Sequence, residues 1–181
     1  MAGDEVTTET PPAVVRIREA DEADARAIAE VHVRSWRWAY RGQLPDDTLD
    51  TLDVAEREGR WRAAIADPAT SVLVAGDDDV LDGFVSVGPA RDDAASPSTA
   101  EVHAIYLEEH AAGKGIGRAL LEQAVEAMRA AGAQRASLWV LESNARARRF
   151  YERAGWAWDG TRSSHQVQCS NMPIVRYVRE L

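Results

Sequence analysis

Three glycines at alternate positions, in the segment Gly113-Lys114-Gly115-Ile116-Gly117, give the chain a stretch that is suited to binding an anion. Glycine adopts positive φ angles without strain and lets a ligand approach the main chain closely. A helix is expected to begin within this segment, and the first amides of a helix have no internal acceptor and lie at the positive end of its dipole. The segment therefore predicts a site for a phosphate or a similar anion.

Two regular elements are expected to hold this turn. Residues 102–107 are apolar, β-branched and aromatic, as in a short buried strand. After the turn, apolar residues recur at helical spacing and fall on one stripe, namely Ile116, Leu120, Leu121, Ala124, Val125 and Met128. The order of elements is therefore strand, short loop, glycine turn and helix.

Two other phosphate-binding motifs do not fit this turn. A P-loop requires glycine at position 108 and Ser or Thr at position 115, where the chain has Glu108 and Gly115. A dinucleotide fingerprint that starts at Gly113 or Gly115 requires glycine at position 118 or 120, where the chain has Arg118 and Leu120. Both motifs are excluded by spacing.

The remaining arrangement resembles the acetyl-CoA-binding segment of the GNAT superfamily of N-acetyltransferases, whose pattern is Q/R-x-x-G-x-G/A. Here the segment starts with Ala112, so the opening Gln or Arg is missing. A second segment resembles the other signature of the family, in which Asn is followed seven residues later by Tyr and then by Gly-Phe. It contains Asn144, Tyr151, Gly155 and Trp156, with Trp in place of Phe. The resemblance covers roughly residues 14–181.

The resemblance implies an α/β (α+β mixed sheet) fold with a central, mostly antiparallel sheet, flanked by about four helices. One parallel strand pair is expected to be splayed at the cofactor site, formed by residues 100–107 and 137–141, since a strand–helix–strand unit pairs in parallel. The splay would leave main-chain groups of Tyr106 and Leu107 free for the pantetheine arm of acetyl-CoA.

Acetyl-CoA is the cofactor that the resemblance implies. Its diphosphate is expected on the amides of residues 113–118, with further contacts from the side chains of Lys114 and Arg118. Asn144 would orient the pantetheine arm, or it would only cap the following helix. The expected cofactor-binding residues are Tyr106, Leu107, Ala112, Gly113, Lys114, Gly115, Ile116, Gly117, Arg118 and Asn144.

Acetylation of an amine requires a base, because a free alkylammonium with a pKa near 10.4 lies about 4–5 kcal/mol from its nucleophilic form at neutral pH. The resemblance implies Glu101 as this base, and strand alternation predicts that it shares a face with Leu107. His103 shares that face and could serve instead or relay the proton. The alternatives are an exposed carboxylate for Glu101 and a core or wall histidine for His103.

The departing thiolate requires a proton or a hydrogen bond, and the resemblance assigns that role to Tyr151. The alternative is an aromatic residue packed beside Phe150. Neither signature fixes the acceptor. An aromatic and basic stretch at the end of the first helix resembles the acceptor side of many GNAT members, with Trp36, Arg37, Tyr40 and Arg41 as candidate contacts, or with Trp36 and Tyr40 as core anchors.

The remaining elements are expected from periodicity and turn residues. Asp21 and Asp24 form a capping box for the first helix. The others are a strand at 14–18, a broken helical region at 44–67, a hairpin at 71–75 and 81–87 across an acidic turn at 76–79, a polar loop at 88–99 beside the acceptor, a helix at 144–154, and a closing hairpin at 156–162 and 174–179 joined by a polar loop at 163–171.

Composition limits the class of protein. The 181 residues suit one domain, expected at residues 14–181 after a disordered tail at residues 1–13. The net charge of −9 disfavours a nucleic-acid partner. With no long apolar run and no signal peptide, a cytoplasmic protein without a membrane partner is expected. The single cysteine, Cys169, forms no internal disulfide, and no metal site is indicated. A homodimer is possible.

The sequence thus predicts an acetyl-CoA-dependent N-acetyltransferase that acts on a primary amine of a small molecule by direct attack in a ternary complex. One alternative is a protein N-terminal or lysine acetyltransferase, and another is a non-catalytic acetyl-CoA-binding regulatory domain. The aromatic residues and the acidic surface mildly favour a cationic or amphipathic amine, and a zwitterionic amino-acid analogue stays open.

Overall fold

The computed structural model describes residues 16–77, 80–92, 95–167 and 170–181. Its sheet has seven strands in the order β1-β2-β3-β4-β5-β7-β6. Only β4 and β5 pair in parallel, so the expected mixed sheet is confirmed for the described residues. In chain order the strands are β1 (Ile17–Glu19), β2 (Ser71–Gly76), β3 (Leu81–Pro89), β4 (Thr99–Leu107), β5 (Arg135–Leu141), β6 (Ala157–Val167) and β7 (Ser170–Glu180). The expected tail at 1–13, Cys169 and part of the acidic turn at 76–79 lie outside the described residues.

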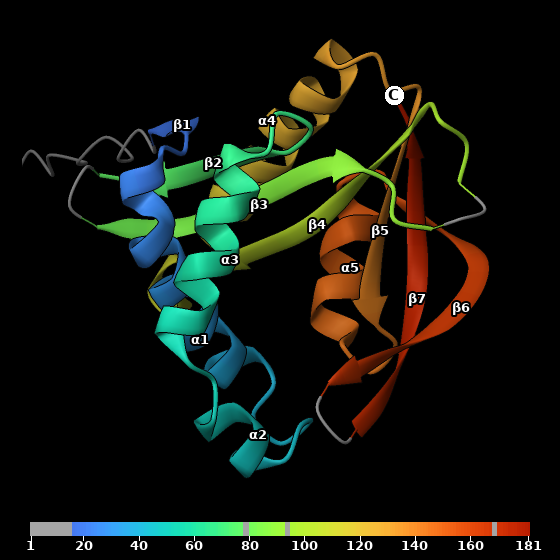
Figure 1. Ribbon diagram of the computed structural model, residues 1–181. Coiled ribbons are helices and arrows are strands. Elements are labelled where there is room, and N and C mark those ends of the chain that lie inside the picture. The colour runs from blue at the N-terminus through green and yellow to red at the C-terminus, as the bar shows by residue number, and fades with distance from the viewer. Residues whose placement is uncertain (1–15, 78–79, 93–94, 168–169) are drawn as a thin grey trace, which may run out of the picture.

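The helices cover the sheet on both faces (Figure 1). They are α1 (Ala25–Ala39), α2 (Asp46–Asp50), α3 (Val54–Ala66), α4 (Ile116–Ala130) and α5 (Ala145–Arg153). α1 and α3 pack with β2 and β3 in one apolar cluster, whereas α4 and α5 pack on the opposite face in a second cluster. The predicted stripe of α4 is buried throughout, and the capping box of Asp21 and Asp24 is present ahead of α1. None of the helices in the described part of the chain is long and apolar enough to cross a membrane.

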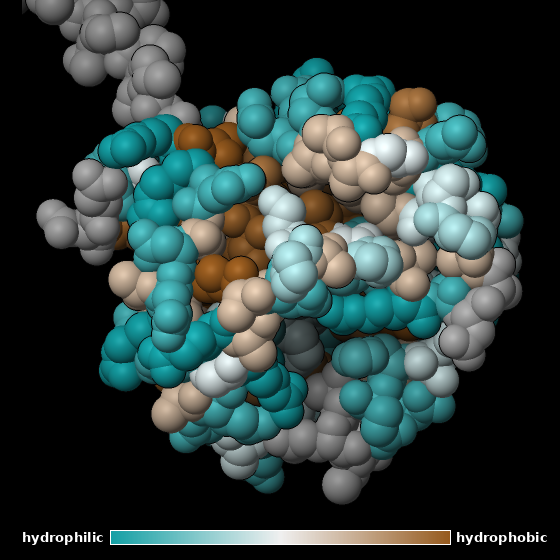
Figure 2. Space-filling model, turned by 45° about the horizontal axis from the view of Figure 1, so that its top comes forward, coloured by the Kyte–Doolittle hydropathy of each residue, from teal (hydrophilic) through white to brown (hydrophobic). Residues whose placement is uncertain are grey.

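Hydrophilic side chains occupy most of the face in Figure 2, and apolar ones gather in its middle.

The prediction of a polar loop at residues 163–171 is wrong. β6 and β7 continue through it as an antiparallel ribbon, in which His165 pairs with Met172 and Gln166 pairs with Asn171. The described side chains of β6 in this part are exposed, so no apolar alternation marks the strand in the sequence.

The parallel pair separates part-way along its length. β4 and β5 pair only from Thr99 to Val102 and from Arg135 to Leu138. Beyond that point β4 stays paired with β3 as far as Leu107, and β5 stays paired with β7 as far as Leu141. The predicted splay is therefore present, and it opens toward the glycine turn that follows β4.

A β-bulge at His103 alters the predicted alternation of β4. Val102 lies opposite Val87 and Ala104 lies opposite Ser86, which leaves His103 without a partner on β3. Val102 belongs to the cluster on the α4 face, but Ala104 and Tyr106 belong to the cluster on the α1 face. The expectation that Glu101 and Leu107 share a face is therefore wrong, because one extra residue reverses the alternation. Glu101 instead faces the same way as Tyr106.

Candidate active site

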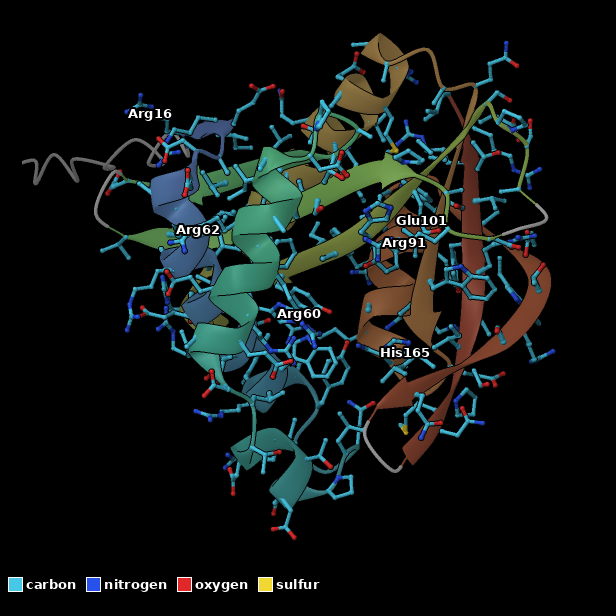
Figure 3. The ribbon with its side chains drawn as sticks, viewed as in Figure 1. Arg16, Arg60, Arg62, Arg91, Glu101 and His165 are labelled. Carbon is cyan, nitrogen blue, oxygen red and sulfur yellow. The ribbon has the colours of Figure 1, made fainter. Side chains whose placement is uncertain are left out.

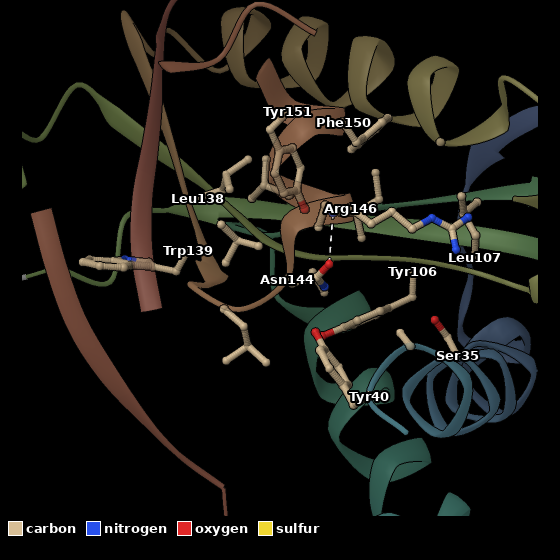
Figure 4. A pocket seen from close by; sticks show the side chains of 18 of the residues that line it. Ser35, Tyr40, Tyr106, Leu107, Leu138, Trp139, Asn144, Arg146, Phe150 and Tyr151 are labelled. Atoms are coloured by element: carbon tan, nitrogen blue, oxygen red, sulfur yellow. Dashed lines mark hydrogen bonds between the residues drawn. The ribbon is translucent and has the colours of Figure 1, made fainter. Parts of the chain in front are cut away.

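A cavity of about 1090 Å³ lies where β4 and β5 diverge. Side chains from α1, β4, β5 and α5 line it, and the glycine turn closes one end. Figure 4 shows Tyr106 and Leu107 from β4 on one side of this space, with Asn144 and Tyr151 from α5 on another. The sequence segments that were predicted to act together therefore meet in one place.

The glycine turn presents bare amides to the cavity. Gly113 and Gly115 have φ angles of 81° and 86°, and a Cβ added at either position would meet no heavy atom within 4 Å. The amides of residues 113 and 115–118 donate to no main-chain acceptor in the described parts of the chain. Gly117 is different, because a Cβ there would lie 2.9 Å from Cδ1 of Leu107. The turn therefore has the open shape and the free donors that an anion requires.

The side chains around the turn contribute less than the sequence predicted. Ala112 and Arg118 line the cavity, but the Arg118 guanidinium is paired with Glu122 at 2.8 Å. Lys114 is exposed and does not line the cavity, and the Ile116 side chain is buried in the core. Any contact of Ile116 with a ligand is thus limited to its main chain.

Main-chain donors also point into the gap between the diverging strands. The amide of Glu108 donates to the carbonyl of Asp82 on β3, at 2.8 Å. Because successive N–H groups of a strand point to opposite edges, the amides of Leu107 and Ile105 face the gap. Both strands thus have unpaired edges at this point, as an added extended segment requires.

Asn144 and Tyr151 lie on the α5 side of the cavity. The Asn144 side chain accepts a hydrogen bond from the amide of Ala147 at 3.0 Å, so it caps α5 and lines the cavity as well. Tyr151 is 7% exposed and its ring packs 5.2 Å from that of Phe150. Burial raises the pKa of the Tyr151 phenol well above its ordinary value. The phenol therefore stays protonated at neutral pH and is able to donate a proton.

Glu101 and His103 lie on β4 at the other end of the cavity. Glu101 is 6% exposed, and its Oε2 accepts a hydrogen bond from the main-chain amide of Arg91 at 3.0 Å. His103 donates from Nε2 to the carbonyl of Pro89 at 3.0 Å, which leaves the buried Nδ1 as an acceptor without a partner among the described residues. Burial lowers the pKa of His103, so its imidazole is neutral at physiological pH.

The four predicted acceptor contacts separate into two pairs. Trp36 and Tyr40 line the cavity, and the ring of Tyr40 meets that of Trp36 at 5.1 Å. Arg37 instead donates to the carbonyl of Leu49 at 3.2 Å and so holds α2, and the exposed Arg41 does not line the cavity. Helical spacing could have predicted this division. Trp36 and Tyr40 are four residues apart and share one helix face, whereas each arginine comes one position later and so points in another direction.

Several lining residues were not predicted from the sequence. They are polar or aromatic, and they include Ser35, Trp38, Arg91, Trp139, Arg146 and His165. Arg146 lies within the second signature, so its position could have been inferred from it. His165 belongs to the strand that was mistaken for a loop, and no pattern in the sequence marks it.

Comparison with known proteins agrees with this geometry. Residues 26–156 match the model of the Acetyltransferase (GNAT) family. An uncharacterized N-acetyltransferase of Bacillus subtilis, YuaI, is 37% identical over 132 residues, which cover 72% of this chain and 74% of YuaI. The fold is similar to that of the paia N-acetyltransferase of Thermoplasma acidophilum, solved with coenzyme A, at a TM-score of 0.74, 22% identity and coverage of 92% and 99%. It is also similar to yncA of Salmonella typhimurium, solved with acetyl-CoA, at a TM-score of 0.71, 22% identity and coverage of 92% and 94%.

Proposed function

Because the chain belongs to the GNAT acetyltransferase family, we propose that it transfers the acetyl group of acetyl-CoA to a primary amine of a small molecule, by direct attack in a ternary complex. One observation carries the proposal. The gap between β4 and β5 and the free amides of the glycine turn belong to a single cavity, which also contains Glu101 and Tyr151.

The chain has the groups that acetyl-CoA requires. The free amides of residues 113 and 115–118 suit a diphosphate, and the absence of a Cβ at Gly113 and Gly115 keeps them accessible. The amides of Ile105 and Leu107 suit the amide groups of a pantetheine arm. Ala112 lacks the side chain that is usual in the family, but its loss removes no main-chain donor.

Acetyl-CoA supplies the acetyl group as a thioester when it is bound. Transfer to an amine forms a C–N bond and breaks the C–S bond, while the nitrogen loses a proton and the sulfur gains one. In our proposal the Glu101 carboxylate takes the proton from nitrogen, and the Tyr151 hydroxyl donates one to sulfur. Such proton transfers are worth about 10²- to 10⁴-fold in rate.

The position of Glu101 requires water in the path of the proton. Six residues separate Glu101 from Leu107, which corresponds to roughly 20 Å of extended strand. His103 lies between them, and its unpaired Nδ1 is able to accept a proton or order a water molecule. The carboxylate therefore acts through water, and the His103 imidazole relays the proton.

Contacts across the cavity favour a small acceptor over a peptide. Ser143, before α5, donates to the side chain of Gln43 at 3.0 Å, and Gln43 follows α1. The Arg146 guanidinium lies 4.5 Å from the ring centroid of Trp38. Both contacts join α5 to the end of α1 and so narrow the opening that a peptide chain would need. An acceptor enclosed by these residues is a small molecule.

Two measurements test this function. Isothermal titration with acetyl-CoA and CoA should give one binding site per chain. A thiol-release assay should then detect acetyl-CoA-dependent turnover with at least one member of a panel of amines, amino acids, aminoglycosides and peptides. If neither CoA nor acetyl-CoA binds, the proposal is overturned. Binding without turnover of any amine would support a regulatory domain, and turnover of peptides alone would support a protein acetyltransferase.

A further inference from the structure

The charge of the cavity is opposite to the charge of the protein. Acidic residues outnumber basic ones 30 to 21 in the whole chain. The described residues that line the cavity nevertheless include one carboxylate, Glu101, and the arginines Arg91, Arg118, Arg146, Arg149 and Arg153. Since arginine is always charged in proteins and, within the described part of the chain, only Arg118 of these five is paired with a carboxylate, the cavity favours ligands that carry negative charge. The phosphate groups of a cofactor can neutralise only those arginines that lie near them.

Arg91 lies away from the place where phosphates are expected. It follows β3, next to Pro89, which pairs with Ala100 at the start of β4. The glycine turn follows the other end of β4, so roughly 20 Å of strand separates the two positions. Arg91 and Glu101 lie close together (Figure 3), as the hydrogen bond from the Arg91 amide to Glu101 requires. Arg91 therefore belongs to the acceptor end of the cavity.

The Arg91 side chain has no acidic partner among the described residues. Its main-chain amide holds Glu101, but its guanidinium takes part in none of the ion pairs found there. Some arginines of this acidic protein are paired with carboxylates, for example Arg34 with Glu108 and Arg176 with Asp92. Among the described residues, Arg146, Arg149 and Arg153 of the cavity have no such pair either, but they come from α5 and not from the loop beside Glu101. A guanidinium left unpaired at the mouth of a cavity is available to a ligand, and its fork of N–H donors matches a carboxylate.

Behind Trp36, which lines the cavity, lies a group of residues that is also rich in donors. The indole N–H of Trp61 donates to Nδ1 of His32 at 3.1 Å, so neutral His32 carries its proton on Nε2. Arg57 therefore finds no acceptor at Nε2, which lies 3.4 Å away. Nε1 of Trp36 and Nε of Arg57 are buried and make no hydrogen bond with the described residues. Donors thus exceed acceptors around Trp36, although His32, Arg57 and Trp61 themselves lie outside the cavity lining.

We infer that the acceptor is a zwitterionic amine of the amino-acid type, whose carboxylate binds the Arg91 guanidinium while its amine faces Glu101 and His103. The inference rests on the proposed function, and it names the substrate class. It differs from the expectation of a cationic amine, because the local charge at Arg91 opposes the net charge of the protein. The hydrogen bond from the Arg91 amide to Glu101 keeps the main chain that carries this guanidinium next to the base.

Matched substrates test the inference. A panel of amino acids and amino phosphonates is assayed by thiol release next to neutral partners, with each amino acid paired with its amide. The acid of each pair, whose carboxylate can bind Arg91, should have a kcat/KM per neutral amine about 10- to 100-fold higher than that of its amide, which is the value of a hydrogen-bonded charge pair. In Arg91→Gln this acid-to-amide ratio should fall at least tenfold, and Arg91→Lys should retain part of it. Arg26→Gln, at an exposed arginine of α1 outside the cavity, should keep the wild-type ratio.

The outcomes separate this inference from the proposed function. If acetyl-CoA does not bind in a titration, the function itself fails. If it binds and the amides are acetylated as well as the acids, or if no anionic amine is acetylated, the inference is overturned. An unchanged ratio in a folded Arg91→Gln variant also overturns it, because the preference would then come from another group.

Discussion

At the scale of single residues, the site combines a buried carboxylate with a buried phenol at opposite ends of one cavity. Glu101 is held by a main-chain amide, whereas the Tyr151 hydroxyl is kept neutral by burial. The sequence predicted both residues, and the structure brings both to the cavity. The sequence could not predict that Arg91 lines the cavity, because the loop that contains Arg91 has no periodicity from which the direction of its side chains could be inferred.

Replacement of Glu101 by Gln should lower kcat/KM by about 10²- to 10⁴-fold, since glutamine keeps the hydrogen bond from Arg91 but cannot take a proton. The affinity for CoA in a titration should stay within about twofold of the wild type. The loss should shrink at alkaline pH, where more of the amine is already neutral. Full activity of the variant at pH 7 would contradict the role of Glu101 as the base.

Replacement of Tyr151 by Phe should lower kcat by about 10²-fold or more and leave CoA affinity unchanged. The raised pKa means that wild-type Tyr151 keeps its proton up to and beyond pH 10, so this residue should cause no loss of activity below that pH. The pH profiles of kcat for both proteins check this. An alkaline limb with an apparent pKa below 9 that disappears in the variant would be inconsistent with the buried, neutral phenol.

At the scale of elements, the junction of β4 and α4 depends on close packing. The strand, the glycine turn and the helical stripe were predicted from periodicity, and they are present. The bulge at His103 could not be predicted, because the apolar pattern of β4 reads as an uninterrupted strand on either side of it. That single extra residue determines which β4 side chains face the acceptor.

Replacement of Gly117 by Ala tests the junction. The new methyl group would meet Cδ1 of Leu107 at 2.9 Å, so the end of this side chain, which lines the cavity, must shift, and the affinity for CoA should fall by about tenfold. Gly59→Ala is the matched control, since Gly59 is also helical but has open space around it. That control should gain about 0.5–1 kcal/mol in the free energy of unfolding and should bind CoA normally. Equal behaviour of the two variants would refute the steric argument.

The packing of α1 against α3 should make stability dependent on pH. Burial, with the charges of Arg57 and Arg60, lowers the pKa of His32 from 6.5 to about 3. Between these values the unfolded chain binds a proton that the folded chain rejects, so the free energy of unfolding falls as the pH falls from 6.5 to 3. The loss should be on the order of 5 kcal/mol, since each pKa unit corresponds to about 1.36 kcal/mol. The free energy of unfolding, measured with urea at several pH values, should change less with pH in His32→Leu than in the wild type. The same pH dependence in both proteins would argue against a neutral, buried His32.

At the scale of the whole molecule, local charge and overall charge differ. The net charge of −9 follows from composition and suggested a cationic acceptor. The arginines that line the cavity come from distant parts of the chain, namely α4, α5 and the loop after β3. Their convergence is a property of the fold and could not be read from composition. The parallel pair was predictable, because a strand–helix–strand unit pairs in parallel. The length of the β6–β7 ribbon was not, since its exposed polar residues resemble a loop.

A crystal structure of the protein with coenzyme A tests the central claim most directly. It should place the diphosphate within about 3 Å of the amides of residues 113 and 115–118. The pantetheine arm should lie between β4 and β5, beside the amides of Ile105 and Leu107. Coenzyme A bound elsewhere, or a gap closed by pairing of β4 with β5 up to Leu107, would contradict the account.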